Sequence, residues 1–146
     1  MACCRSVIQP LDNAAQRYPV SVKGVLCHDR RVVLVGNSRG EWELPGGKLE
    51  LGETPEACVA PELTEELAVD VTVGPLRDAW VYDIAGDVHV VVLVYGCRAA
   101  KMPEHLVSPE AQPVGLFAPD ALDGLPLPAG YRRAIEAWFA SVRRSG

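Results

Sequence analysis

The sequence lacks the features that mark membrane, exported and zinc-dependent proteins. Its 146 residues contain no apolar run approaching the roughly 20 residues that span a bilayer. The N-terminal segment lacks the continuous apolar core of a signal peptide. His28, His89 and His105 show no spacing typical of zinc ligands or of a nucleophile and its base. These absences predict a cytoplasmic protein with no membrane partner.

Paired cysteine motifs are also missing. The five cysteines form an odd set with no C-x-x-C pair and no metal-type spacing. This pattern predicts reduced thiols without a chemical role rather than a disulfide framework, as expected in a cytosolic compartment. The cysteines are Cys3, Cys4, Cys27, Cys58 and Cys97.

Basic residues are too few for a protein that holds a nucleic-acid backbone. The chain has 14 lysines and arginines against 19 acidic residues, a formal net charge of −5. Binding to a polyphosphate backbone depends on clustered positive charge, so a nucleic-acid partner is not expected. A small anionic substrate would need metal ions to approach so acidic a protein.

Apolar residues, in contrast, are plentiful. They make up 49% of a chain that has the length of one ordinary domain, enough to close one core without disulfides or zinc. We therefore expect a single domain over residues 1–146.

The first structured part of the chain reads as β structure. The β-branched runs Val20–Leu26 and Val32–Val35 are separated by a short polar segment, which predicts a hairpin. Residues 42–44 then lead into Pro45-Gly46-Gly47, a breaker cluster that predicts a sharp turn before any helix begins.

A helix is predicted from about Pro55 to Leu67. Thr54 supplies an N-cap hydroxyl directly before a proline at the first helical position. Val59, Leu63 and Leu67 recur every four residues and give the helix an apolar face.

Three further strands are expected after this helix, at Val69–Val73, Asp78–Asp83 and Val88–Tyr95. Gly86-Asp87 provides a hairpin turn between the last two. The third strand is so apolar that we expect it at the centre of a sheet, covered on both faces.

The remaining chain predicts one more strand and a closing helix. A looser stretch, Ala99–Pro113, precedes a short strand at Val114–Phe117. Gly130–Arg143 reads as an amphipathic helix. Its expected inward residues are Ile135, Trp138, Phe139 and Val142. This mixture predicts an α/β (α+β) fold in which a mixed β-sheet is sandwiched between helices.

Three glutamates gather on one side of the first helix. Glu62, Glu65 and Glu66 stand at i, i+3 and i+4, so their carboxylates project within a narrow arc. An ordinary solvated acidic face would have the same spacing. The sequence upstream of the helix favours a functional cluster instead.

The segment GKLELGETPEACVAPELTEELAV, residues 47–69, resembles the Nudix box, G-x5-E-x7-R-E-U-x-E-E-x-G-U, where U is a bulky aliphatic residue. The lead-in WELPGGK, residues 42–48, is also similar to that family. Seven of the nine specified positions match. The matching residues are Gly47, Glu53, Glu62, Leu63, Glu65, Glu66 and Val69.

The resemblance implies a magnesium-dependent hydrolase of a nucleotide's phosphoanhydride, with Mn2+ as an alternative metal. It assigns Glu62, Glu65 and Glu66 as catalytic metal ligands, adds the Gly46 carbonyl as a further ligand, and gives Glu53 a catalytic supporting role. Mg2+ prefers such hard oxygen donors. A later loop often adds one more carboxylate, for which Glu110 is the candidate against Glu104, Asp83 and Asp87.

Substrate-binding residues are predicted beside the box. Lys48 occupies a position where many family members carry a lysine that meets a phosphate, and Arg39 and Trp42 complete the predicted set. Other aromatic residues could stack on a nucleobase, although core packing is the stronger expectation for each. They are Trp80, Tyr82, Phe117 and Tyr131.

Two positions depart from the family pattern. Pro61 replaces the arginine before the first helical glutamate, which removes the donor that normally orients a catalytic carboxylate. A proline inside a helix costs about 3 kcal/mol, so we expect a kink or a distorted turn between Ala57 and Pro61. Ala68 replaces a glycine and predicts either a left-handed residue or an altered helix exit.

Two functions remain open from the sequence. The first is a pyrophosphohydrolase acting on a (d)NTP, ADP-ribose or a nucleotide sugar. The second is a nucleotide-binding or regulatory module on the same scaffold that has lost turnover, motivated by Pro61. Many family members pair, so a homodimer is one expectation for an oligomeric state that the sequence does not fix.

Overall fold

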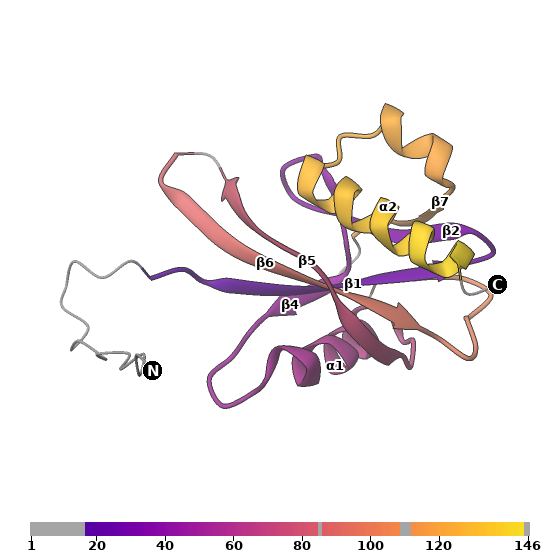
Figure 1. Cartoon of the computed structure of the whole chain (residues 1–146), viewed down its shortest axis with the longest axis horizontal. Coiled ribbons are helices and arrows are strands. Elements are labelled where there is room, and N and C mark those ends of the chain that lie inside the picture. The colour runs from indigo at the N-terminus through magenta and orange to yellow at the C-terminus, as the bar shows by residue number, and fades with distance from the viewer. Residues whose placement is uncertain (1–16, 85, 109–111, 145–146) are drawn as a thin grey trace, which may run out of the picture.

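The computed structural model describes residues 17–84, 86–108 and 112–144. Their elements form one mixed sheet with a helix on each face (Figure 1). The strands are β1 (Val20–His28), β2 (Arg31–Gly36), β3 (Trp42–Glu43), β4 (Gly46–Lys48), β5 (Thr72–Ile84), β6 (Val88–Arg98) and β7 (Val114–Phe117). The helices are α1 (Pro55–Leu67), a 3-10 helix η1 (Pro119–Gly124) and α2 (Ala129–Arg144). The expected mixed sheet between helices is confirmed.

The sheet runs in the order β3-β2-β1-β6-β5, with β4 paired to β1 and β7 to β2. Strand β1 pairs in parallel with β6, from Val20 beside Val91 to Leu26 beside Cys97. Its other edge pairs antiparallel with β4 in its first half and with β2 at its end. β1 therefore connects the hairpin with the short glycine strand that matters for the site.

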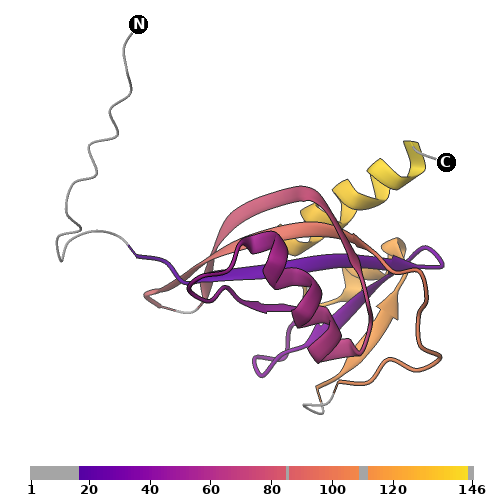
Figure 2. The same ribbon diagram turned by 90° about the horizontal axis from the view of Figure 1, so that it is seen from below.

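The core has two halves, one under each helix. In β2, Val32 and Leu34 belong to the half packed on α2, and Val33 and Val35 to the half packed on α1. This alternation follows from the two-residue period of a strand whose two faces are both buried. Figure 2 shows α1 lying across one face of the sheet and α2 on the far side.

Helix α1 has the predicted bounds and the predicted apolar face. The Thr54 hydroxyl accepts a hydrogen bond from the Ala57 N–H at 3.2 Å, and Val59, Leu63 and Leu67 are buried. At its end Ala68 takes the left-handed conformation, with φ 56° and ψ 37°, and its N–H donates to the Thr64 carbonyl. The first alternative for Ala68 is thus confirmed.

Helix α1 continues through Pro61 as one helix, and the expected kink or distorted turn between Ala57 and Pro61 stays a prediction. Ala57 and Pro61 both lie on the exposed side of α1. There water can bond to the Ala57 carbonyl that the proline leaves without an N–H donor, and solvent-facing carbonyls can tilt outward. Glu62, Glu65 and Glu66 therefore belong to the same helix as its start at Pro55.

Three expectations from the sequence need correction. Residues 45–47 do not simply turn the chain, because Gly46–Lys48 forms strand β4. The two strands expected around Gly74-Pro75 are one strand, β5, whose register shifts between Val73 and Asp78 absorb the irregularity. Val142 is 40% exposed, since it lies in the last turns of α2.

Several other elements and buried residues predicted from the sequence agree with the structure. The β1–β2 hairpin, the strand β7 and the inward positions of Ile135 and Trp138 are confirmed. Strand β6 lies inside the sheet, although its first residues near the turn at Gly86 are exposed. Cys27, Cys58 and Cys97 are free thiols, whereas Cys3 and Cys4 lie outside the described residues.

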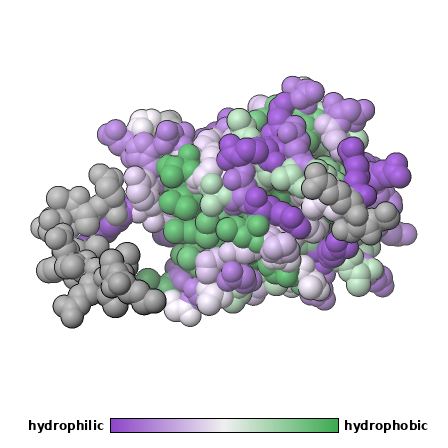
Figure 3. All heavy atoms as spheres, viewed as in Figure 1, coloured by the Kyte–Doolittle hydropathy of each residue, from purple (hydrophilic) through white to green (hydrophobic). Residues whose placement is uncertain are grey.

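The face of the molecule seen in Figure 1 carries polar side chains and a local patch of apolar ones. Figure 3 shows apolar side chains concentrated on one part of the face seen in Figure 1, with polar side chains over most of the remainder. Exposed apolar residues of β5 and β6 are Leu76, Val81 and Val88. Among the described residues, no helix has the length and apolar character needed to cross a membrane.

Candidate active site

Two glycines bring strand β4 against helix α1. Gly46 has φ 153°, and a Cβ there would stand 2.0 Å from the Val22 carbonyl oxygen. A Cβ on Gly47 would stand 2.3 Å from the Glu62 carboxylate. Only glycine fits at position 46, whereas a side chain at position 47 would displace the flexible end of Glu62, so close approach on both sides explains the Gly46-Gly47 pair.

Helix α1 aims two of its glutamates at this strand. The Gly46 N–H donates to Glu66 Oε2 at 2.9 Å, and the Glu62 carboxylate lies over Gly47. Buried Leu63 and Leu67 fix the helix rotation that makes both contacts. The spacing of the box therefore places a helical carboxylate at each glycine.

Negative charge is concentrated around Glu62. Burial raises the pKa of Glu62, and the charges of Glu65, Glu53 and Glu50 raise it further, while Lys23 opposes them. A raised carboxyl pKa means that the ionised form is penalised at this place. A cation would relieve that penalty.

The other acids of the box occupy the rim of this region. Glu53 Oε1 accepts a hydrogen bond at 2.8 Å from the Glu50 N–H and so closes the loop before α1, and Glu65 is exposed. Among the described residues, no three His, Cys, Asp or Glu side chains are grouped closely enough to hold a metal. The structure thus brings Glu62 and Glu66 to the glycine strand, while Glu53 and Glu65 act on Glu62 through charge.

The predicted carboxylate from a later loop, Glu110, lies outside the described residues. Of its competitors, Asp83 pairs with His89 and Asp87 lies at the turn between β5 and β6. Glu104 is exposed beside His105 in the segment after β6.

A pocket of about 280 Å³, here called the central pocket, opens beside the glycine strand. It is lined by Pro19, Val20, Ser21, Lys23, Arg39, Glu43, Lys48, Tyr82, Ile84, Val90, Val92 and Tyr131. Its charged residues are three cations and one acid, in a chain whose net charge is −5. Such a lining suits an anionic ligand with an apolar or aromatic portion.

Two of the three predicted substrate-binding residues line the central pocket, and one does not. Arg39 and Lys48 line the central pocket. Trp42 does not, because its ring packs edge-on against Phe117, with centroids 4.8 Å apart, at the core. Tyr82 and Tyr131 line the pocket, with ring centroids 6.3 Å apart.

A polar network holds the wall formed by the β2–β3 connection. The Arg39 Nε donates to Glu41 at 2.8 Å, and the Tyr82 hydroxyl donates to the same carboxylate at 2.8 Å. Asn37 Oδ1 accepts from the backbone N–H groups of Arg39 and Glu41. Arg39 therefore reaches the pocket from a connection tied to strand β5.

Sequence reasoning missed Lys23 and favoured core packing over nucleobase stacking for Tyr131. Lys23 is 7% exposed and its Nζ lies 3.5 Å from Glu43 Oε1. Its signal was a single lysine within the apolar run Val20–Leu26, because lysine is almost never buried unless it has a partner.

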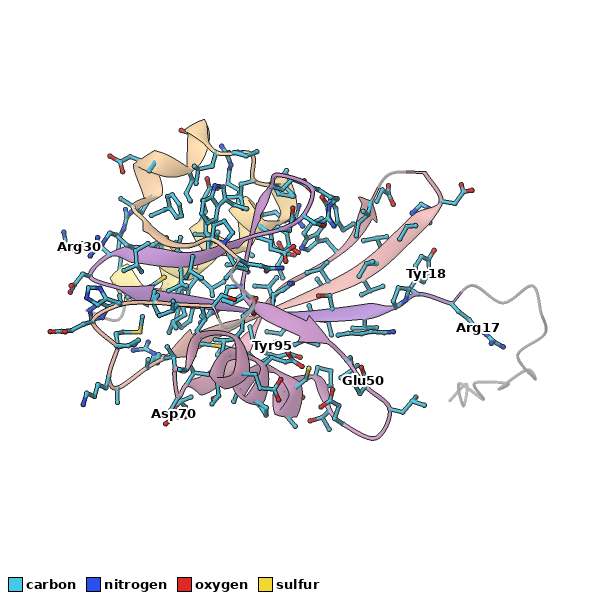
Figure 4. The ribbon with its side chains drawn as sticks, turned by 180° about the vertical axis from the view of Figure 1, so that it is seen from behind. Arg17, Tyr18, Arg30, Glu50, Asp70 and Tyr95 are labelled. Atoms are coloured by element: carbon cyan, nitrogen blue, oxygen red, sulfur yellow. The ribbon has the colours of Figure 1, made fainter. Side chains whose placement is uncertain are left out.

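A second pocket, here called the hairpin pocket, lies elsewhere. It measures about 810 Å³ and is lined by Cys27, His28, Asp29, Arg30, Pro119, Phe139, Val142 and Arg143. Figure 4 shows Arg30 at one end of the molecule, well away from Glu50 in the loop before α1. The larger hollow is thus separated from the glutamates.

Comparison with known proteins agrees with this geometry. The model of the NUDIX domain matches residues 17–139. The chain belongs to the Nudix family. A MutT-like protein of Streptomyces ambofaciens is 38% identical over 105 residues, which cover 70% of this chain and 66% of that protein. An 8-oxo-dGTP diphosphatase of Proteus vulgaris is 39% identical over 75 residues, 47% of this chain and 66% of that protein. The matches thus span slightly less than two thirds of these relatives.

Solved structures of this Nudix chain's relatives share its fold. A MutT NUDIX hydrolase from Burkholderia pseudomallei superposes with a TM-score of 0.71 at 31% identity, covering 84% of this chain and 98% of that one. The E. coli dihydroneopterin triphosphate pyrophosphohydrolase gives a TM-score of 0.72 at 18% identity, covering 86% and 99%. At such low identity the second likeness concerns the fold alone.

Proposed function

We propose that this Nudix chain is a divalent-metal-dependent pyrophosphohydrolase that cleaves the phosphoanhydride of a nucleoside triphosphate derivative. The observation that carries the proposal is the position of Glu62 over Gly47 and Glu66 on the Gly46 N–H, next to the central pocket. A cluster of carboxylates beside a pocket with cationic walls suits a metal and a phosphate chain together.

By the chemistry of their donor atoms the predicted ligands suit a hard divalent cation, although no three of the described His, Cys, Asp and Glu side chains are grouped to hold one in this structure. Glu62, Glu65 and Glu66, with the Gly46 carbonyl, would supply only oxygen donors, the kind that Mg2+ and Mn2+ accept. The negative charge around Glu62 already favours a cation there. When bound, such an ion neutralises phosphate charge and lowers the pKa of a water for attack at phosphorus.

The protein's own groups then divide the remaining work. The hydrogen bond from Gly46 orients Glu66, and Gly47 leaves room for Glu62 to turn its carboxylate toward the strand. Lys48 and Arg39 offer positive charge to the phosphates at the pocket wall. Tyr82 and Tyr131 offer aromatic surface to a nucleobase.

Among the substrate classes left open by the sequence, we favour the triphosphates over ADP-ribose and nucleotide sugars. The support comes from the relatives, which are named as a MutT-like protein and as 8-oxo-dGTP diphosphatases. Specificity for the base is set by the lining of the central pocket rather than by the box, so direct assay identifies the base.

The test is release of nucleoside monophosphate from (d)NTPs, 8-oxo-dGTP, ADP-ribose and nucleotide sugars with Mg2+ or Mn2+. Glu66→Gln keeps an oxygen for the Gly46 N–H but removes the charge, so kcat should fall at least about 100-fold. Glu56→Gln is the matched control, because Glu56 lies in the first turn of α1 and contacts Tyr95. Equal turnover by wild type and Glu66→Gln would refute the proposal.

The second candidate is the nucleotide-binding module without turnover. The exposed proline at position 61, where the box has arginine, favours it. Because α1 is continuous through position 61, the arginine of Pro61→Arg would stand on the same helix as the glutamates. If the missing guanidinium limits catalysis, Pro61→Arg raises kcat. Metal-dependent nucleotide binding without product from either form would establish the module instead.

A further inference from the structure

Lys23 is the one lysine of the described chain that is buried. It is 7% exposed, whereas Lys48 and Lys101 are exposed, and these three are all the lysines in the sequence. Burying an ammonium group is costly unless it is paired. A residue kept buried at this cost, in a strand of otherwise apolar and small residues, calls for a physical reason.

The side chain of Lys23 connects the two parts of the site. A Cβ on Gly46 would stand 3.0 Å from Lys23 Cδ, so the lysine stem runs alongside Gly46, whose N–H holds Glu66. The same side chain lines the central pocket. Lys23 therefore lies at the junction between the helical carboxylates and the pocket.

The ion pair between Lys23 and Glu43 is long, and Glu43 has further partners. Its Nζ is 3.5 Å from Glu43 Oε1, longer than a normal charge-assisted hydrogen bond. Glu43 also accepts from Asn37 Nδ2 at 3.3 Å and lies 3.8 Å from Arg39 Nη2. Glu43 thus keeps partners without the lysine, so the ammonium can leave it at modest cost.

We propose that Lys23 is a phosphate-binding residue whose ammonium leaves Glu43 for a phosphate oxygen when a nucleotide enters the central pocket. This rests on the proposed function, because it assumes that the pocket receives a phosphate chain. A triphosphate carries several negative charges, whereas Glu43 carries one and also interacts with Asn37 and Arg39, so the triphosphate is the stronger partner for the ammonium. Arg39 is less free to move, since Glu41 holds its Nε at 2.8 Å.

Calorimetry measures this without turnover. The probes are the α,β-methylene analogue of dGTP and inorganic triphosphate, each with Mg2+. Lys23→Met should weaken both by about 10- to 100-fold, the usual range for a lost charged hydrogen bond. Lys23→Arg should retain most of the affinity, and Lys101→Met, a surface control, should bind like wild type. Binding by Lys23→Met within twofold of wild type would overturn the proposal.

Glu43→Gln gives a second test with the opposite sign. Removing the competing carboxylate should tighten binding of triphosphate several-fold in the wild-type background, and by less when Lys23 is methionine. A purely structural role for the pair predicts instead that both Lys23→Met and Glu43→Gln weaken binding, which would refute the exchange. Loss of turnover in Glu66→Gln is independent of these results, so the proposed function and this inference can fail separately.

Discussion

Of the two pockets in this molecule, the smaller one has the more chemical features of a functional site. The hairpin pocket is almost three times as large as the central pocket, at about 810 Å³ against about 280 Å³. Its apolar lining residues are Cys27, Pro119, Phe139 and Val142, and burial raises the pKa of Cys27 to about 12. A thiol that stays protonated is not a nucleophile. The cysteine of the hairpin pocket therefore supplies no nucleophile.

The central pocket is small, but strands and loops distant in sequence bring charge to it. Lys23 comes from β1, Lys48 from β4, and Arg39 from the connection between β2 and β3. The glycine strand β4 joins this wall to the carboxylates of α1. The comparison teaches that convergent charges beside a carboxylate cluster, rather than volume, mark the site.

The largest effect is expected from a side chain added at Gly47, next to the Glu62 carboxylate. Gly47→Ala would place a Cβ 2.3 Å from the Glu62 carboxylate and displace it. We expect kcat to fall at least about 100-fold while the protein stays folded, since the carboxylate is flexible. Gly124→Ala is the control, because nothing lies within 4 Å of its added Cβ. Near-normal turnover by Gly47→Ala would remove Glu62 from the site.

A smaller effect is expected in the wall of the central pocket. Burial raises the pKa of Glu41, but the hydrogen bonds from Arg39 and Tyr82 outweigh it, so the pKa lies below its ordinary value. Glu41→Gln should cost about 1 kcal/mol of unfolding free energy at pH 7.

The pH dependence of that cost has a definite sign. A lowered carboxyl pKa stabilises the fold above the unfolded value of 4.5 and loses this contribution as pH falls through the folded value. Denaturant unfolding from pH 7 to pH 3 should therefore show the difference between wild type and Glu41→Gln shrinking below about pH 4.5. A difference that is constant with pH would mean that Glu41 acts by packing alone.

The smallest effect is predicted for the hairpin pocket. Val142 is 40% exposed there, so Val142→Ser should change the unfolding free energy by less than about 0.5 kcal/mol. Steady-state assays should give a kcat/KM within twofold of wild type. A large loss of activity in this variant would give the larger pocket a role and reverse the comparison.

Prediction from sequence succeeded where local signals and packing agreed. Thr54 and Pro55 start α1, and Val59, Leu63 and Leu67 give it a face that the sheet buries, so its bounds followed from the sequence. It failed at Gly74-Pro75, a breaker pair that the sheet tolerates, because the pair falls where β5 shifts register against β6.

The candidate site divides in the same way. The helical spacing alone placed Glu62, Glu65 and Glu66 on one side of α1, because a helix turns about 100° per residue. The sequence also singled out Lys48 and Arg39, which do line the central pocket. It could not separate Trp42 from Tyr82, since an aromatic residue in a strand serves the core and a pocket equally well.

The sequence by itself determined the helix with its acidic spacing, the glycine pair and the mixed order of strands and helices. Only the tertiary structure decided which residues surround that helix. Pairing of β1 with both β4 and β6 buries Lys23 beside Gly46 and carries it to the pocket. Local propensity extends over a few residues, whereas such strand pairings join residues far apart in the chain, so their outcome depends on how the whole core packs.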